Sequence, residues 1–126
     1  LMGRIYPDFG MRWMSDIDIL IAPELTDLVI HHLRTMGFIT IDEDKWAANN
    51  FKNVMHKKIE GVEIVIELHT KLFFHQDQEN FKTTTYSHLA FPVLQLEEEF
   101  IHLVGHCIFQ HNFLKFYWLY DCLLFY

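Results

Sequence analysis

The sequence predicts an α+β fold, and three patterns along the chain lead to that prediction. Residues 16–22 alternate acidic and apolar side chains with the period of a strand, residues 52–69 have the pattern of a β-hairpin, and residues 97–126 are largely helical in pattern. The chain has 126 residues, 51% of them hydrophobic, so it can bury one core and not comfortably two. It begins with Leu1 and stops inside an apolar run, so we expect a domain-sized piece of a longer protein.

The first pattern is a strand with two different faces. Between Asp16 and Ala22 the three isoleucines would point one way, and Asp16 and Asp18 the other. A helix is expected to follow over residues 24–36, where apolar side chains recur at helical spacing and Gly37 comes next. The stripe expected to pack on the isoleucine face, leaving the acid face open, consists of Leu25, Leu28, Val29 and Leu33.

The second pattern is the hairpin. Residues 52–59 and 62–69 flank Glu60-Gly61, a short Gly-containing connection of the kind that closes a β-hairpin. On the second arm the apolar side chains share one face, while Glu67 and His69 share the other, polar face. There, His69 could orient Glu67, or a water, by a hydrogen bond.

The remaining expected elements are a short strand at residues 38–41 and two helices, at residues 97–110 and 113–126. The first helix starts with three glutamates, which suit a helix N-terminus, and carries an apolar stripe. The second is apolar almost all round, as a buried central helix would be. Asp121 lies inside it. Because a buried carboxylate should not be left unpaired, we expect Asp121 to anchor a network with a His or an Arg.

The two aspartates of the first strand have a chemical use. Carboxylates at alternate positions of a strand lie roughly 6–7 Å apart on one face, so they can share divalent cations. A third carboxylate from a neighbouring strand would complete a two-metal site, and Glu67 is the natural third acid. The alternative is an ordinary solvated strand edge, because an Asp-x-Asp pattern alone is a weak signal.

Four short segments spread over most of the chain strengthen the metal-site interpretation. They are residues 6–12 (Tyr-Pro-Asp-Phe-Gly-Met-Arg), 14–21 (Met-Ser-Asp-Ile-Asp-Ile-Leu-Ile), 66–69 (Ile-Glu-Leu-His) and 118–121 (Trp-Leu-Tyr-Asp). Together they resemble the uncharacterised nucleotidyltransferase family within the DNA polymerase beta-like nucleotidyltransferase superfamily. The resemblance is strongest at the Arg-x-Met-Ser-Asp-Ile-Asp segment.

The resemblance implies both a fold and a metal site. The fold is a small mixed β-sheet with flanking helices, followed by C-terminal helices. The nucleotidyltransferase core would cover residues 1–96, truncated at its N-terminus, and a helical part would cover residues 97–126 and continue beyond the fragment. Asp16 and Asp18 would be ligands of Mg²⁺ or Mn²⁺, and Glu67 would be the third acid, which also favours deprotonation of the acceptor.

The sequence shows fewer of the residues that would bind the phosphates of a nucleotide. Members of this family usually carry a Lys-Gly or Gly-Ser element before the Tyr-Pro segment, and this chain begins too late to show it, since Gly3-Arg4 aligns poorly. The candidate nucleotide-binding residues are Arg12, Ser15 and Lys57. Each has a plainer alternative: an ion pair with an acid such as Asp8 for Arg12, a turn for Ser15, and a solvated strand edge for Lys57.

Charge and spacing exclude several other classes of function. A formal net charge of −7 argues against non-specific binding to nucleic acid. No apolar stretch approaches the ~20 residues of a membrane span, and residue 1 is not followed by a charged region and then a hydrophobic one, so we expect a cytoplasmic protein. Cys107 and Cys122 lack metal-type spacing and are interpreted as buried thiols. His102 and His106 could bind zinc from one helix, with His111 one turn later, but Leu103 stands where a zinc hydrolase has its glutamate.

The predicted function is therefore nucleotidyl transfer. A nucleoside monophosphate would pass from a nucleoside triphosphate to an acceptor hydroxyl by two-metal-ion catalysis, and a small molecule, a protein or an RNA end all remain open as the acceptor. The alternative is a non-catalytic, antitoxin-like or regulatory module that retains the fold and binds a protein partner through exposed aromatic side chains.

Overall fold

The computed structural model of the chain describes residues 5–12, 14–41, 52–72, 82–86, 91–109 and 116–125. They belong to two compact units. Residues 13–77 form the sheet unit, and residues 1–12 together with residues 78–126 form the helical unit. The expected boundary between residues 96 and 97 is a different division of the chain and stays a prediction.

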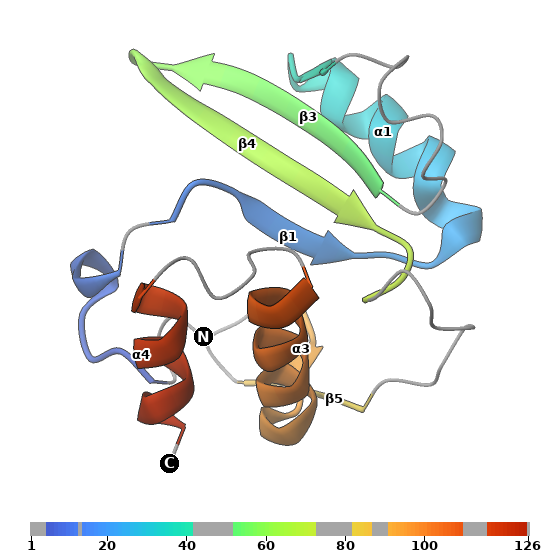
Figure 1. Ribbon diagram of the computed structural model, residues 1–126. Coiled ribbons are helices and arrows are strands. Elements are labelled where there is room, and N and C mark those ends of the chain that lie inside the picture. The colour runs from blue at the N-terminus through green and yellow to red at the C-terminus, as the bar shows by residue number, and fades with distance from the viewer. Residues whose placement is uncertain are drawn as a thin grey trace. The chain divides into compact units, whose positions relative to one another are not determined.

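The sheet unit contains the strands β1 (Ile17–Leu20), β2 (Ile39–Thr40), β3 (Lys52–Ile59) and β4 (Val62–His69). Their order in the sheet is β1-β4-β3-β2. The edge strand β1 runs parallel to β4, and the other neighbours are antiparallel (Figure 1). A small mixed sheet accompanied by helices confirms the predicted α+β class.

The hairpin of β3 and β4 forms where the sequence predicts it. Glu60 and Gly61 connect the two strands, with φ angles of 49° and 88°. Two residues in the left-handed region match the right-handed twist of the strands, and glycine adopts this region without a steric penalty. Because the turn fixes the register, Lys52 pairs with His69 at the far end of the hairpin.

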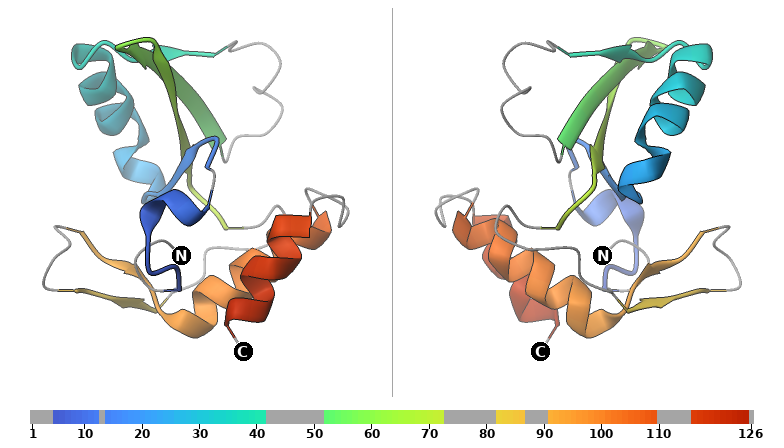
Figure 2. Two further views of the ribbon diagram at one scale, coloured as in Figure 1. Left: turned by 90° about the vertical axis from the view of Figure 1, so that its left-hand side faces the viewer. Right: turned by 90° about the vertical axis from the view of Figure 1, so that its right-hand side faces the viewer.

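Helix α1 (Thr26–Thr35) covers one face of this sheet (Figure 2). It follows a 3-10 turn at Pro23–Leu25, and Gly37 just past its end has a φ angle of 86°. The amide of Phe38 donates a hydrogen bond of 3.0 Å to the carbonyl of Leu33. This is the bond of a Schellman motif, which satisfies a carbonyl at the helix end and brings two buried side chains into the same core.

The core of the sheet unit lies between α1 and the sheet. Its buried members are Leu33, Phe38, Met55, Ile66 and Leu68, and Ile21, Val29, Ile30 and Ile64 pack against them. Met55 and Leu68, from adjacent strands, are completely buried. The covered face of the sheet is therefore the apolar face that the alternation of residues predicts, but of the three isoleucines expected there only Ile21 packs against the core, and Ile17 and Ile19 are 45% and 37% exposed.

The helix contacts this core through a different stripe from the predicted one. Leu25 and Leu28 are 45% and 64% exposed, whereas Val29, Ile30 and Leu33 lie in or against the core. Leu25 belongs to the 3-10 turn and does not continue the α-helical face. At 3.6 residues per turn, Leu28 points away from that face. The prediction was right about Val29 and Leu33 and wrong about Leu25 and Leu28.

The helical unit contains α3 (Leu96–Phe109) and α4 (Phe116–Leu124), with a strand pair β5 (Thr83–Thr84) and β6 (Val93–Leu94) and a 3-10 turn at Phe9–Met11. Aromatic rings connect the two helices. The ring centres of Phe100 and Phe125 are 5.3 Å apart, and those of His106 and Trp118 are 4.7 Å apart. Helix α4 lies inside its predicted range of residues 113–126, and α3 begins one residue before its predicted range of residues 97–110.

The described part of α4 is not buried all round. Phe116 and Leu123 are 88% and 70% exposed, whereas Asp121 is completely buried. The prediction of a central buried helix is therefore wrong for residues 116–124, and residues 113–115 and 126 lie outside the described residues. Despite this exposed apolar surface, the helices of the described segments lack the combined length and hydrophobicity of a membrane span.

Candidate metal-binding site

The candidate site lies on the face of the sheet that α1 does not cover. In the parallel pair of β1 and β4, Asp18 stands opposite Glu67, and Ile17 stands opposite Ile66. Successive side chains of a strand alternate between faces, so Asp18 and Glu67 share the face opposite to that of the core residue Ile66. The predicted position of Glu67, on a strand beside the aspartate strand and facing the same way, is confirmed.

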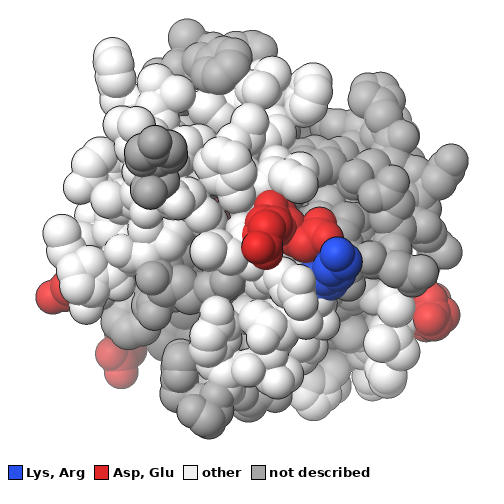
Figure 3. All heavy atoms as spheres, turned by 90° about the horizontal axis from the view of Figure 1, so that it is seen from below, with Lys and Arg blue, Asp and Glu red and all other residues white. Residues whose placement is uncertain are grey.

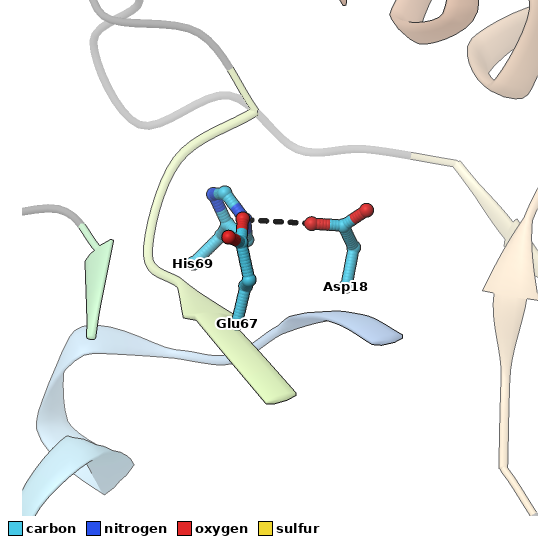
Figure 4. Close-up of side chains that lie close together, drawn as sticks. All are labelled: Asp18, Glu67 and His69. Carbon is cyan, nitrogen blue, oxygen red and sulfur yellow. Dashed lines mark hydrogen bonds and ion pairs between the residues drawn. The ribbon is translucent and has the colours of Figure 1, made fainter. Parts of the chain in front are cut away.

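Three side chains converge on this face: Asp18, Glu67 and His69 (Figure 4). Each offers one ligand atom, and these atoms all lie within 4.8 Å of one another. The Nε2 atom of His69 is 2.9 Å from Oδ1 of Asp18 and 3.3 Å from Oε2 of Glu67. The carboxylates of Asp18 and Glu67 are therefore close enough to share one cation.

Positive charge lies next to these acids. Burial alone would raise the pKa of Glu67, but hydrogen bonds from His69 and Lys52 outweigh burial and lower the pKa. Burial alone would lower the pKa of His69, but hydrogen bonds to Asp18 and Glu67 outweigh it and raise the pKa. Lys52 also forms an ion pair with Glu67. Lys52 and His69 thus stabilise the ionised form of Glu67, as a cation would.

The donor set fits a divalent cation. Carboxylate oxygens are the ligands that Mg²⁺ and Mn²⁺ prefer, and an imidazole nitrogen extends the choice to other first-row metals. Because metal ligands must be deprotonated, a cation would displace any proton on Nε2 of His69 and compete with Lys52 for Glu67. The side chain of Asp18 is 39% exposed, against 15% for Glu67 and 11% for His69, so the cluster opens to solvent at Asp18.

The comparison with known protein families agrees with this chemistry. The family model that matches the chain, over residues 1–126, is that of an uncharacterised nucleotidyltransferase. The chain belongs to this nucleotidyltransferase family. The resemblance seen in the sequence is thereby confirmed. No curated protein and no solved structure matches the chain.

Asp16, the other aspartate expected in the nucleotidyltransferase site, is not part of the three-residue cluster among the described residues. Strand β1 starts at Ile17, one residue later than predicted, so Asp16 precedes the paired segment. Its Oδ1 atom accepts a 3.0 Å hydrogen bond from the hydroxyl of Ser15. Metal binding by Asp16 and phosphate binding by Ser15 stay predictions.

The structure does not bring Lys57 to the acids. Lys57 lies two positions after Met55 on β3, so it shares the covered face of the sheet with Met55. Its Nζ atom donates a 2.6 Å hydrogen bond to the carbonyl of Met36. The same atom lies 5.8 Å from the ring centre of Phe38. The nucleotide-binding role of Lys57 stays a prediction, and this placement does not favour it.

Lys52 is the lysine that contacts the cluster, and sequence reasoning gave it no role. The signal was present: counting outward from the Glu60-Gly61 turn pairs Lys52 with His69, on the same face as Glu67. His69 itself was expected to orient Glu67 or a water. Its contact with Asp18 as well depends on the register between β1 and β4, which no local pattern in the sequence specifies.

Arg12, the remaining candidate for nucleotide binding in this family member, lies in the helical unit. Its Nε and Nη2 atoms are 2.8 Å and 2.7 Å from Oδ2 of Asp121. Its guanidinium also lies over the rings of Tyr117 and Trp118, at 5.4 Å and 4.9 Å from their centres. The hydroxyl of Tyr6 donates to the other oxygen of Asp121. The predicted buried network around Asp121 is therefore confirmed.

The partner of Arg12 differs from the one suggested by the sequence. Asp8 instead accepts a 2.7 Å hydrogen bond from the amide of Gly10, where it caps a 3-10 turn. Burial and the hydrogen bond to Asp121 raise the pKa of Tyr6 to about 12. Phosphate binding by Arg12 stays a prediction, whereas its ion pair with a completely buried carboxylate is a structural role.

The other metal-site candidate lies on α3. His102 and His106 stack with their ring centres 5.7 Å apart, and His106 packs edge-on against Trp118. Within the described segments, Asp18, Glu67 and His69 are the group of three ligands that comes together. His111, the further histidine of the zinc alternative, lies outside the described residues, so that alternative stays untested. Cys107 is buried, as predicted, and Cys122 is half-buried.

Proposed function

We propose that this nucleotidyltransferase family member transfers a nucleoside monophosphate from a nucleoside triphosphate to an acceptor hydroxyl. The acceptor oxygen forms a bond to the α-phosphorus, the bond between that phosphorus and the bridging oxygen breaks, and pyrophosphate leaves. Asp18 and Glu67 hold divalent cations, and Asp16 is proposed as a further ligand. The acceptor is a small molecule, a protein side chain or an RNA end.

The pairing of Asp18 with Glu67 across two parallel strands is the observation that supports this proposal. An ordinary strand edge would leave its acids separate and solvated. Here the side chain of Glu67 is 15% exposed, and keeping a carboxylate ionised in such a place costs free energy unless cations surround it. The family match supplies the reaction class for which two nearby acids are needed.

Each acid has a role that follows from its surroundings. When bound, Mg²⁺ or Mn²⁺ neutralises charge on the triphosphate and helps to activate the attacking hydroxyl. Glu67, with its lowered pKa, is ionised at neutral pH, and its charge favours loss of the acceptor proton. Asp18 is the more exposed of the two acids, so it faces the incoming triphosphate.

The test separates transfer from binding. The protein is incubated with Mg²⁺ or Mn²⁺, labelled nucleoside triphosphates and candidate acceptors, and label on the acceptor is measured. Asp18→Asn and Glu67→Gln should each reduce transfer by about 100-fold or more, because each removes a metal ligand. The melting temperature should rise with nucleotide and metal in the wild type and not in Asp18→Asn.

Glu63→Gln is the matched control. Glu63 lies on β4 with the same parity as Glu67, and its side chain, 62% exposed, bonds to His56. We expect its substitution to leave transfer and the melting shift unchanged. Unchanged transfer in Glu67→Gln would remove Glu67 from the mechanism, and equal melting shifts in wild type and Asp18→Asn would remove Asp18.

A partner-binding module without catalysis is the second candidate function, and the surface of the helical unit favours it. An apolar groove on α3 and α4 is lined by Leu96, Glu97, Phe100, Leu119, Cys122, Leu123 and Phe125. On the face of the protein seen in Figure 3, the described residues include few Lys, Arg, Asp or Glu side chains, and acids gather there beside a basic side chain. This candidate predicts no transfer with any acceptor and no melting shift with nucleotide and metal.

A further inference from the structure

We propose that His69 is a direct ligand of the metal in this site and makes the site prefer Mn²⁺ to Mg²⁺. The inference rests on the proposed function for the place of the cation. It goes beyond that function by naming which cation is bound and which side-chain atom selects it.

The direction of the imidazole is the first observation. Nε2 of His69 faces both carboxylates, at 2.9 Å from Asp18 and 3.3 Å from Glu67 (Figure 4). A histidine that only oriented Glu67 would need to contact that carboxylate alone. An atom that contacts both acids lies where a cation shared by them would be within its reach, since the three ligand atoms lie within 4.8 Å of one another.

The second observation is that the side chain and the main chain of His69 are both held in place. The side chain is 11% exposed, and the residue lies at the end of β4, two positions after Glu67 on the same face. Its main chain is held as well, because the amide of Ile21 donates a 2.8 Å hydrogen bond to the carbonyl of His69. All three ligands therefore belong to two directly paired strands, and ligands on such rigid elements are preorganised.

The chemistry of the donors sets the preference. Mg²⁺ demands near-ideal octahedral geometry, prefers oxygen ligands and retains several waters. Imidazole suits first-row transition metals, whereas carboxylates suit both Mg²⁺ and Mn²⁺. Of these two cations, Mn²⁺ is the transition metal, so it accepts an imidazole nitrogen beside two carboxylates more readily than Mg²⁺ does. His69 should thus add affinity for Mn²⁺ and little for Mg²⁺.

Direct ligation is tested by pulsed electron paramagnetic resonance on the protein loaded with Mn²⁺ alone. We expect modulation from a directly bound ¹⁴N nucleus in the wild type and its loss in His69→Gln. The control is His56→Gln, because His56 lies on the same face of the sheet and bonds to Glu63 at 2.8 Å. It should keep the nitrogen signal. A wild-type spectrum without nitrogen coupling would overturn the proposal even if His69→Gln failed to fold.

Metal preference is tested by equilibrium binding of Mn²⁺ and of Mg²⁺. The wild type should bind Mn²⁺ at least about tenfold more tightly than Mg²⁺. His69→Gln should weaken Mn²⁺ binding by about 10–100-fold and Mg²⁺ binding by less than about threefold. Equal weakening for both cations would mean that His69 only positions the acids, and equal wild-type affinities would refute the preference.

Failure of this inference and failure of the proposed function give different results, because neither readout involves nucleotide transfer. A nitrogen signal in a protein that transfers no nucleotide would retain His69 as a ligand and reject the proposed function. Transfer supported by Mg²⁺ in a protein without a nitrogen signal would retain the function and reject the ligand.

Discussion

Lys52 and His69 face each other across the two strands of the hairpin, and both contact Glu67. This arrangement explains how a carboxylate that is 15% exposed keeps its charge, since both neighbours lower the pKa of Glu67. It also implies competition: a cation bound by Glu67 has to displace the ammonium of Lys52. The same contacts thus stabilise the acid and limit its affinity for metal.

The buried ion pair of the helical unit leads to a prediction about stability. Asp121 is completely buried and the side chain of Arg12 is 10% exposed, so Arg12→Met leaves a buried carboxylate without its main counter-charge. We expect a loss of about 3–5 kcal/mol in the free energy of unfolding, measured by urea denaturation. The double variant Arg12→Met with Asp121→Leu should recover most of this loss, because it removes both charges.

The control for Arg12 is Arg34→Met. Arg34 is exposed on α1, where it donates a hydrogen bond of 3.2 Å to Thr40. Its substitution should change stability by no more than about 0.5 kcal/mol. Losses of equal size for Arg12→Met and Arg34→Met would show that the network around Asp121 contributes nothing particular to stability.

The same network predicts a change of stability at alkaline pH. The ordinary pKa of tyrosine is 10.0, whereas that of folded Tyr6 is raised to about 12. The folded chain therefore binds more protons than the unfolded chain between these values, so the contribution of Tyr6 is complete below pH 10 and is lost as the pH rises toward about 12. Tyr6→Phe should lose this part of the pH dependence.

Unfolding at a series of pH values from neutral to alkaline measures the effect as the difference between wild type and variant. Tyr120→Phe is the control, because Tyr120 is 51% exposed and its ring lies 6.4 Å from that of Tyr6. Its pH profile should follow that of the wild type. A constant difference between wild type and Tyr6→Phe from pH 8 to 12 would contradict the prediction.

The parts of the site that sequence could predict are those fixed by local rules. Alternation along a strand placed Glu67 on the face of Asp18, and a two-residue turn fixed the hairpin register. The same counting could have excluded Lys57 from the acid face, because it pairs with Ile64 on the covered face. It could also have placed Lys52 opposite His69.

Other contacts were beyond local reasoning. Arg12 and Asp121 are 109 residues apart, and no periodicity connects them. Arg12 pairs with Asp121 and not with the nearby Asp8 because of the way α4 packs against the N-terminal segment within the helical unit. Likewise, a 3-10 first turn removed Leu25 from the packed face of the helix, and residue spacing alone does not reveal such a turn.

The hairpin turn gives a prediction about backbone strain. Gly61 has a φ angle of 88°, and apart from Gly61 itself and its two chain neighbours no described atom lies within 4 Å of the place that a β-carbon would occupy. Gly61→Ala should therefore cost about 1–2 kcal/mol through conformation alone, measured by urea unfolding. Glu60 already has a φ angle of 49°, which glycine adopts without a steric penalty, so Glu60→Gly should leave the free energy of unfolding nearly unchanged. A neutral Gly61→Ala would mean that the turn changes its type.

The competition at Glu67 gives the last prediction. Lys52→Met removes an ion pair whose two side chains are 14% and 15% exposed, so the metal-free protein should lose about 1–3 kcal/mol of stability. Mn²⁺ binding should at the same time become several-fold tighter, because Glu67 no longer has to release an ammonium and a repelling charge is gone. Lys58→Met is the control, since Lys58 is exposed, shares the face of Lys52 and pairs with Glu63. Titration calorimetry with Mn²⁺ compares the three proteins. Unchanged or weaker Mn²⁺ binding in Lys52→Met would show that the ion pair and the cation do not compete for the same carboxylate.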